Sequence, residues 1–229
     1  MLSGIPIPKD AVRPPETVLV NITPQETRVA VLEENNICEL HIERNSGHSL
    51  VGNIYLGVVR RVLPGMQSAF IDIGLERAAF LHIVDVLEQR RNPDETQRIE
   101  HMLFEGQSVL VQVIKDPINT KGARLSTQIS LAGRFLVHLP QEDHIGISQR
   151  IEDERHSLRE RLTNLLPEDA CHGYIIRTNA ENATDEQLQS DIHYLTKVWE
   201  HIQEQAKIQP PETLLYQDLP LSLRVLRDM

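Results

Sequence analysis

An arginine and a threonine that follow a short apolar segment are the residues of this sequence best suited to bind a terminal phosphate. Arg177 and Thr178 come directly after Gly-Tyr-Ile-Ile at 173–176, and a polar stretch follows them. A guanidinium can donate two parallel hydrogen bonds to a phosphate, and an adjacent hydroxyl can donate a third. The pattern therefore indicates a phosphate site, with a solvated arginine at a strand end as the alternative.

Aromatic side chains in the first half of the chain point to a second kind of chemistry, the stacking of nucleic-acid bases. Aromatic residues make up only 4% of the chain, yet Tyr55, Phe70 and Phe80 lie in one stretch rich in β-branched residues. Rings on a small barrel hold single strands by stacking, at roughly 1–3 kcal/mol per base, and basic side chains at the rim hold the phosphates. The basic candidates are Arg60, Lys121 and Arg124. The alternative for each ring is packing in the core.

Sequence motifs of catalysis are missing. The sequence contains no glycine-rich phosphate loop that ends in Lys-Ser/Thr, no Gly-x-Ser-x-Gly and no His-Glu-x-x-His. His193 and His201 would be about 12 Å apart on a helix, which is too far to share a metal ion. Two cysteines, Cys38 and Cys171, are too few for a disulfide scaffold or a cysteine-only metal site. We therefore expect no complete active site in this chain.

The composition is that of a globular chain with an uneven charge distribution. Basic residues number 23 and acidic residues 33, a net charge of −10, which argues against nucleic-acid binding by the whole surface. Residues 49–127 nevertheless hold nine residues of each sign, so this neutral segment can present one basic face. No apolar run approaches the roughly 20 residues of a membrane span, and the first residues lack the apolar core of a secretion signal. We expect a cytoplasmic protein without membrane contact.

The elements that must position these residues are short strands followed by helices. About five strands with glycines at their corners are predicted between 49 and 127, which is typical of a small closed barrel or sandwich. A helix is predicted over 152–165. The pair Thr184 and Gln187 matches a capping box, and it opens a long amphipathic helix. Its apolar stripe is Leu188, Ile192, Leu195, Trp199 and Ile202. The chain stops within a helical pattern, so we expect a truncated domain.

Four long segments carry a family resemblance. They are VGNIYLGVVRRVLPGMQSAFIDIGLERAAFLH at 51–82, NTKGARLSTQISLAGRFLVHLP at 119–140, IGISQRIED at 145–153 and GYIIRTNAEN at 173–182. In this order they resemble the bacterial ribonuclease E/G family, and the similarity extends from about residue 17 to the last residue. The segments at 63–74 and 189–202 are closer to the ribonuclease G branch than to the ribonuclease E branch.

The resemblance implies an α+β fold in which an S1-type five-stranded OB β-barrel and an α/β 5′-sensor subdomain are inserted into an incomplete ribonuclease H-like subdomain. Residues 1–16 would be a disordered extension, and residues 17–48 the first part of the ribonuclease H-like subdomain. Residues 49–127 would be the S1 RNA-binding domain. Residues 128–206 would be the 5′-sensor, and residues 207–229 the start of the second ribonuclease H-like part.

The resemblance also assigns roles to individual residues. Phe70 and Phe80 would stack on RNA bases, and Lys121 would contact the RNA. The 5′-monophosphate would be bound by Arg177 and Thr178, helped by Gly133 and Val137. Two positions depart from the family pattern. Leu56 stands where a lysine is usual, which removes one phosphate contact, and Gln149 stands where ribonuclease E has an arginine.

The function implied by the resemblance is that of the N-terminal, RNA-binding and 5′-monophosphate-sensing part of a single-strand-specific endoribonuclease in rRNA processing and mRNA decay. The family's Mg²⁺-binding catalytic domain and Zn²⁺-binding cysteines lie outside this chain. We therefore expect the chain to bind neither metal and to be inactive alone, and we expect the full-length enzyme to be a homo-oligomer. The alternatives are a stand-alone, non-catalytic S1-type RNA-binding protein, and a protein-interaction module in which Arg177 is incidental.

Overall fold

A computed structural model describes residues 16–44, 47, 49–86, 98–167 and 173–229, and these residues form two units. The first unit comprises the described part of 1–48 together with 219–226, and the second comprises 49–218 and 227–229. The predicted extension at 1–16 lies outside the described residues except for Glu16, and Cys171 also lies outside them.

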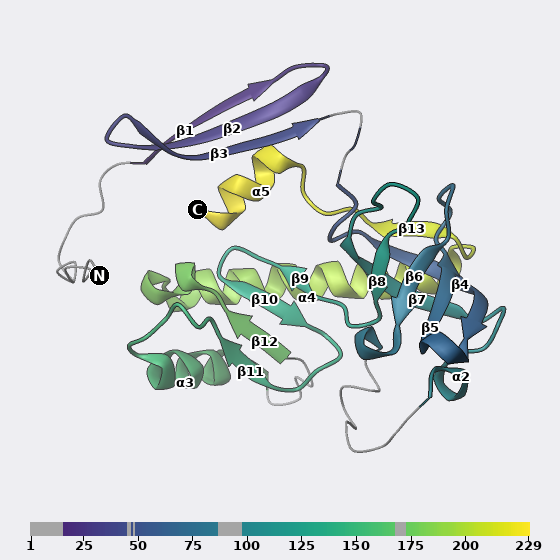
Figure 1. Cartoon of the computed structure of the whole chain (residues 1–229). Helices are drawn as coiled ribbons and strands as arrows, with labels where there is room; N and C mark the ends of the chain where they lie inside the picture. The colour runs from purple at the N-terminus through teal and green to yellow at the C-terminus, as the bar shows by residue number, and fades with distance from the viewer. Residues whose placement is uncertain (1–15, 45–46, 48, 87–97, 168–172) are drawn as a thin grey trace, which may run out of the picture. The chain divides into compact units, whose positions relative to one another are not determined.

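The first unit is a three-stranded antiparallel sheet with a helix (Figure 1). Its strands are β1 (Glu16–Ile22), β2 (Glu26–Glu33) and β3 (Asn36–Arg44), and helix α5 (Leu221–Asp228) contributes its residues up to 226. Val29 and Val31 of β2 are buried, as are Leu221 and Val225 of α5. The helix is tied to β3 because Glu43 accepts a hydrogen bond from the Leu221 backbone N–H.

The second unit contains a closed, five-stranded barrel. The strand order is β4-β5-β6-β8-β7, and pairing between β4 and β7 closes it. The bounds are β4 (Ile54–Leu63), β5 (Ser68–Asp72), β6 (Ala79–His82), β7 (Ser108–Lys115) and β8 (Arg124–Ser126). The pair β6–β8 is parallel and the others are antiparallel. Of the two predicted alternatives, a small closed barrel and a sandwich, the structure shows the closed barrel, and its five strands are consistent with an OB-type fold.

Short elements and a sixth strand lie beside the five strands of the barrel. They are the 3-10 turns η2 (Pro64–Met66) and η3 (Ile83–Asp85), the one-turn helix α2 (Ile99–Met102), and β13 (Thr213–Tyr216), which pairs with β4. Gly57 allows β4 to lie close to β5, since a Cβ at this position would be 2.5 Å from the Ile71 side chain. The barrel core includes Val59, Ile71, Leu81 and Leu125.

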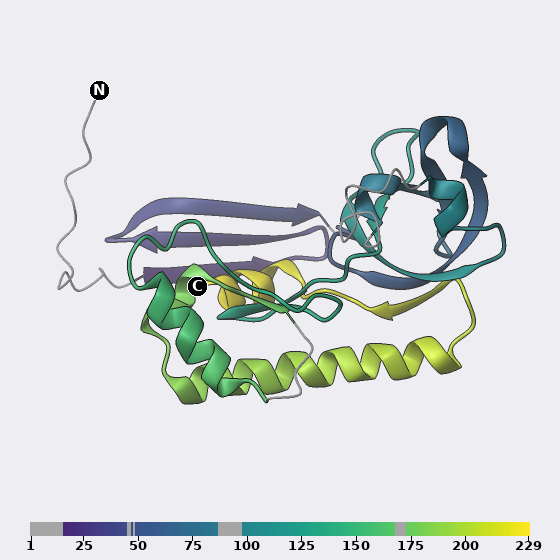
Figure 2. The same cartoon turned by 90° about the horizontal axis from the view of Figure 1, so that it is seen from below.

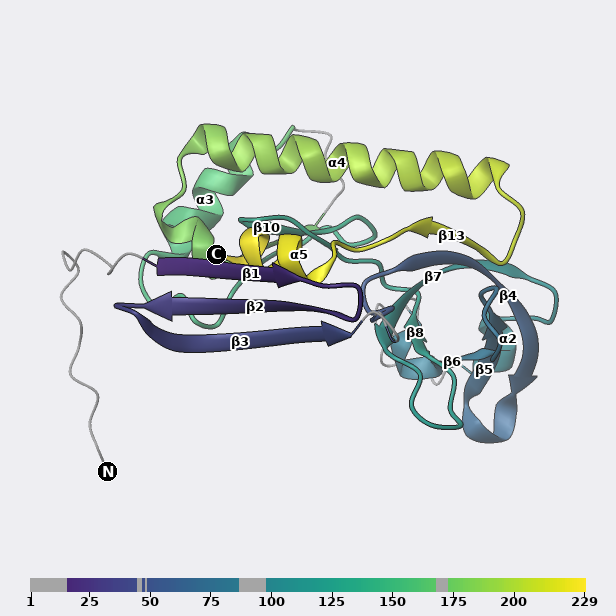
Figure 3. The same ribbon diagram turned by 90° about the horizontal axis from the view of Figure 1, so that it is seen from above.

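The rest of the second unit is a small mixed sheet with two helices on one face (Figures 2 and 3). The order is β11-β12-β10-β9, with bounds β9 (Leu131–Ala132), β10 (Leu136–Leu139), β11 (Ile145–Ile147) and β12 (Gly173–Ile176). The helices are α3 (Arg155–Leu165) and α4 (Asp185–Ile208), and η4 (Thr178–Asn182) joins β12 to α4.

Helix α4 begins and packs as its sequence predicts. Thr184 accepts a hydrogen bond from the Gln187 backbone N–H, and the Gln187 side chain accepts one from the Thr184 N–H, which completes the capping box. All five residues of the predicted apolar stripe are buried. The same core takes in Ile54 of β4, so α4 packs against both the small sheet and the barrel wall. Within the described residues, no helix has the length and apolarity that a membrane span requires.

Candidate nucleic-acid interface

Two phenylalanine rings lie side by side on the outer surface of the barrel. Phe70 of β5 and Phe80 of β6 are directly paired across the two strands, and their ring centroids are 6.2 Å apart in an edge-to-face arrangement. The neighbours Ala69 and Ile71 are fully buried, so the alternation of a β-strand turns Phe70 outward. Phe70 is 36% exposed and Phe80 is half-buried. Both rings are therefore accessible to a ligand.

The rings open into a groove of 890 Å³ with a basic lining. Its basic side chains are Arg77, Lys115, Lys121 and Arg124, and its one acidic side chain is Asp116. Lys121 is exposed, in the turn that is closed by backbone hydrogen bonds between Ile118 and Lys121. The structure therefore brings Phe70, Phe80 and Lys121 together, and the neutral segment presents one basic face.

Two residues expected at this surface lie elsewhere. Tyr55 is only 5% exposed and belongs to the barrel core. It lies on β4 next to Ile54, and this part of the strand is covered on both faces. Arg60 does not line the groove. Its guanidinium is paired with Asp72 at 3.0 Å and with Glu212 at 2.6 Å, so its charge is already balanced. The expectation of an open ring at Tyr55 was wrong, whereas a phosphate contact by Arg60, whose side chain is 54% exposed, stays a prediction.

Leu56 is also a packed residue rather than a surface residue. Leu56 is buried on β4 and lies opposite Leu110 of β7 on one side and Thr213 of β13 on the other. A leucine fits this apolar position between strands, where a lysine would need to extend its ammonium group to the surface.

A second candidate site surrounds Arg177 at the end of β12. It is a cavity of 310 Å³ whose polar lining is Ser148, Arg150, Arg177, Thr178, Asn179 and Asp228. The Arg177 guanidinium donates a hydrogen bond to the Gly133 carbonyl at 2.6 Å and pairs with the Asp228 carboxylate at 2.8 Å. The hydroxyls of Ser148 and Thr178 are 3.3 Å apart. Arg177 and Thr178 are thus together at one hollow, as their adjacency in sequence predicts.

Gly133 and Val137 take different places around this cavity. Gly133 contacts Arg177 through its carbonyl oxygen. A Cβ at Gly133 would lie 2.5 Å from the Asp191 carboxylate of α4, so glycine is required for this close approach. Val137 is half-buried on β10, opposite Ala132 and Ile175, and does not line the cavity. Gln149 is exposed and is not a lining residue, whereas its neighbour Arg150 is.

The Asp191 carboxylate organises the loop that carries Gly133. It accepts hydrogen bonds from the backbone N–H groups of Arg134, Phe135 and Leu136 at 3.2, 2.9 and 2.9 Å. The loop is thereby held against α4, with the Gly133 carbonyl directed at Arg177. Sequence reasoning missed Asp191, Ser148 and Asp228, although Ser148 lies within a segment that carried the family resemblance.

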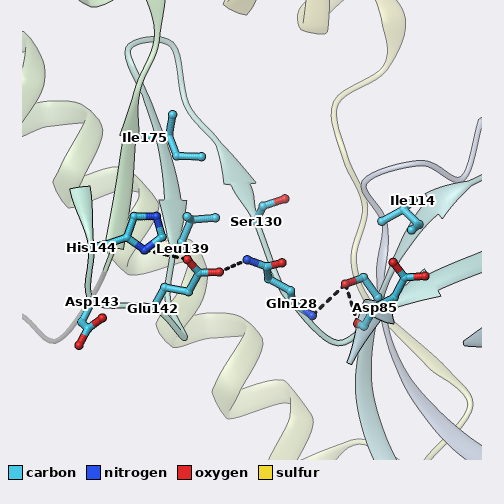
Figure 4. A pocket seen from close by; sticks show the side chains of 10 residues that line it. Asp85, Ile114, Gln128, Ser130, Leu139, Glu142, Asp143, His144 and Ile175 are labelled. Atoms are coloured by element: carbon cyan, nitrogen blue, oxygen red, sulfur yellow. Dashed lines mark hydrogen bonds and ion pairs between the residues drawn. The ribbon is translucent and has the colours of Figure 1, made fainter. Parts of the chain in front are cut away.

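A third hollow, of 700 Å³, separates the barrel from the small sheet (Figure 4). Figure 4 shows Glu142 reaching toward both His144 and Gln128, while Asp85 lies on the barrel side. Asp85 is buried and pairs with Arg124 of the basic groove at 2.8 Å. Among the described residues no group of three or more His, Cys, Asp or Glu side chains is placed to hold a metal ion.

Comparison with known proteins gives matches over nearly the whole chain. A model of the Ribonuclease E/G family matches residues 130–229. Ribonuclease G of Haemophilus influenzae is 45% identical over 220 residues, covering 92% of this chain and 44% of that protein. Ribonuclease G of Escherichia coli K12 is 47% identical over 220 residues, covering 92% and 45%. Ribonuclease E of a Nostoc species is 40% identical over 209 residues, covering 91% and 30%. The chain spans less than half the length of these relatives.

Proposed function

Because the chain belongs to the ribonuclease E/G family, we propose that it is the N-terminal, RNA-binding and 5′-monophosphate-sensing part of a ribonuclease G-like, single-strand-specific endoribonuclease. The observation that carries this proposal is the outward-facing pair Phe70 and Phe80 in a groove with four basic side chains. In this function the barrel would bind the body of the RNA, and the Arg177 cavity would bind its 5′ end.

The groove suits an unpaired strand for two physical reasons. Exposed rings stack on any base, because every base has a π-face, and an unpaired base is free to leave its neighbours and reach them. The basic side chains Lys115 and Lys121 can neutralise phosphates of the same strand. A duplex keeps its bases stacked inside and offers the rings nothing to bind. The groove therefore favours single strands without reading a particular sequence.

The Arg177 cavity suits a terminal phosphate. It combines the Arg177 guanidinium with the hydroxyls of Ser148 and Thr178 and the amide of Asn179, which together can donate several hydrogen bonds to phosphate oxygens. A 5′-hydroxyl would leave the guanidinium without an incoming anion, and a 5′-triphosphate carries two further phosphoryl groups that a small cavity must exclude. The cavity would therefore select a 5′-monophosphate against both a 5′-hydroxyl and a 5′-triphosphate.

The activity of the whole enzyme is part of the same proposal. With Mg²⁺ bound in its catalytic domain, the enzyme would hydrolyse single-stranded RNA and leave a 5′-phosphate, in rRNA processing and mRNA decay in the cytoplasm. Full-length chains would form a homo-oligomer, with Zn²⁺ between protomers. The residues that would hold these ions are expected in the parts of the enzyme outside this chain.

A stand-alone, non-catalytic S1-type RNA-binding protein would use the same two surfaces. We favour the nuclease, because relatives named ribonuclease G and ribonuclease E match over the same nine-tenths of the chain. The binding step is common to both hypotheses and can be tested directly on this chain.

The test is a fluorescence anisotropy titration with an unstructured RNA labelled at its 3′ end and carrying either a 5′-monophosphate or a 5′-hydroxyl. We expect tighter binding of the phosphorylated RNA, and affinity for both RNAs that falls with added salt because bound phosphates release counterions. Arg177→Ala should remove the difference between the two RNAs while leaving the affinity for the hydroxyl RNA nearly unchanged. Affinity that depends on neither salt nor the 5′ group would contradict the proposal and favour a protein-interaction module.

A further inference from the structure

The carboxylate of Asp228 occupies the anion-binding side of Arg177. The Arg177 Nη2 and Asp228 Oδ1 atoms are 2.8 Å apart, while the other terminal nitrogen of Arg177 donates to the Gly133 carbonyl. Both terminal nitrogens of the guanidinium are therefore already engaged within the protein. Asp228 lines the same cavity as Ser148 and Thr178, so its negative charge lies where the proposed phosphate would bind.

Asp228 is held in this place by more than one partner. The Asn179 side-chain amide donates to the Asp228 backbone carbonyl at 2.8 Å. The Arg227 Nε atom lies 2.9 Å from Asp228 Oδ1, and Arg227 also pairs with Asp218 at 3.3 Å. Burial opposes the ionisation of Asp228, but the hydrogen bonds and charges of Arg227 and Arg177 outweigh it and lower the pKa of the carboxyl below its ordinary value. Asp228 is thus a fixed anion at neutral pH.

An incoming phosphate and this carboxylate compete for one set of donors. A 5′-monophosphate carries a charge of roughly −1.5 to −2, and like charges within a few ångströms repel, most strongly where water is partly excluded. The Arg177 side chain is only 23% exposed, so the repulsion is incompletely screened. Close binding of the phosphate to Arg177 therefore requires the Asp228 carboxylate to move away from the guanidinium.

On the premise of the proposed phosphate site, we propose that Asp228 is a specificity-determining residue that competes with the 5′-phosphate for Arg177. The RNA end binds by exchange, with the phosphate replacing the carboxylate on the guanidinium. An end without a phosphate cannot make this exchange, and Arg177 then stays paired with Asp228. The competition lowers the affinity for phosphorylated ends.

The test is the isosteric variant Asp228→Asn in the anisotropy titration with both RNAs, using the whole 229-residue chain. Removal of the charge should tighten binding of the 5′-monophosphorylated RNA by roughly two- to fivefold, as expected for one partly exposed ion pair. The affinity for the 5′-hydroxyl RNA should change by less than about twofold on the same scale. Adding Arg177→Ala to Asp228→Asn should abolish the gain. Thermal melting curves of all variants verify that the fold is retained.

Asp218→Asn is the matched control, because Asp218 pairs with Arg227 but not with Arg177. It removes the same charge from the same neighbourhood and should not tighten binding of the phosphorylated RNA. Equal tightening by both variants, or tightening of both RNAs by Asp228→Asn, would overturn the proposed competition in favour of a general charge effect. Wild-type discrimination that Asp228→Asn leaves unchanged would also overturn it. Absence of discrimination in every variant would instead contradict the phosphate site itself.

Discussion

At the scale of single residues, the proposed binding of an RNA strand depends on which rings of the barrel face outward. Phe70 is exposed and Tyr55 is buried, although both lie on strands of the same barrel. The alternation of a strand gives each residue one of two faces, and the faces inside the barrel are filled by branched aliphatic side chains such as Ile71 and Val111. Phe70 therefore lies on the outer face of the barrel, where its ring is available for stacking.

Phe70→Ala should weaken RNA binding by roughly 1–3 kcal/mol, because one stacked base loses its ring. The loss should be equal for 5′-phosphorylated and 5′-hydroxyl RNA, since the groove does not read the RNA end. The measurement is the anisotropy titration, with urea unfolding to check stability.

The matched control for Phe70→Ala is Phe104→Ala. Phe104 is an exposed phenylalanine near the same barrel, at 68% exposure, but it does not line the groove. Its loss should leave RNA affinity unchanged. Equal effects of the two variants on RNA affinity would contradict a specific role of Phe70 in binding, and unfolding of the Phe70→Ala protein would show that Phe70 serves packing.

At the scale of elements, helix α4 supports both candidate sites. Its stripe packs against the small sheet and against Ile54 of the barrel, and its Asp191 holds the loop whose Gly133 carbonyl accepts from Arg177. The geometry around Arg177 thus depends on where α4 begins and how it is seated. The capping box at Thr184 is the local feature that sets this beginning.

Thr184→Ala should lower the free energy of unfolding by about 1 kcal/mol, because the hydrogen bond from the Gln187 N–H to the cap is lost. Urea unfolding monitored by circular dichroism measures this change. Thr163→Ala is the control, because Thr163 is exposed within α3 and its change to alanine removes no cap. It should change stability by less than about 0.5 kcal/mol. A loss in Thr163→Ala as large as that in Thr184→Ala would contradict the capping role.

At the scale of the whole molecule, the two units differ in how much apolar surface they bury. The second unit has two cores, one in the barrel and one under α3 and α4. The first unit has Val29, Val31, Leu221 and Val225 as its buried apolar residues, while Leu19 and Leu40 on the other face of its sheet are more than half exposed. A three-stranded sheet with so small a core is marginally stable by itself.

We expect the first unit to open without unfolding the second. In native-state hydrogen exchange, the amides of Val29 and Val31 should exchange well before those of Val111 and Leu125 in the barrel, which serve as the internal reference. The physical reason is that opening the first unit exposes far less apolar area than opening the barrel. Equal protection of the two sets of amides would mean that the whole chain unfolds as one unit.

The sequence by itself determined the features that depend on near neighbours. The capping box, the buried stripe of α4, the strands of the barrel and the adjacency of Arg177 and Thr178 all follow from side chains within a few positions of one another, whose geometry is set by the repeat of a helix or strand. Only the tertiary structure decided which charges face one another. Glu212 neutralises Arg60 from 152 positions away, and Asp228 meets Arg177 from a distant segment. Such pairs depend on the path of the chain through space, which no local pattern of residues encodes.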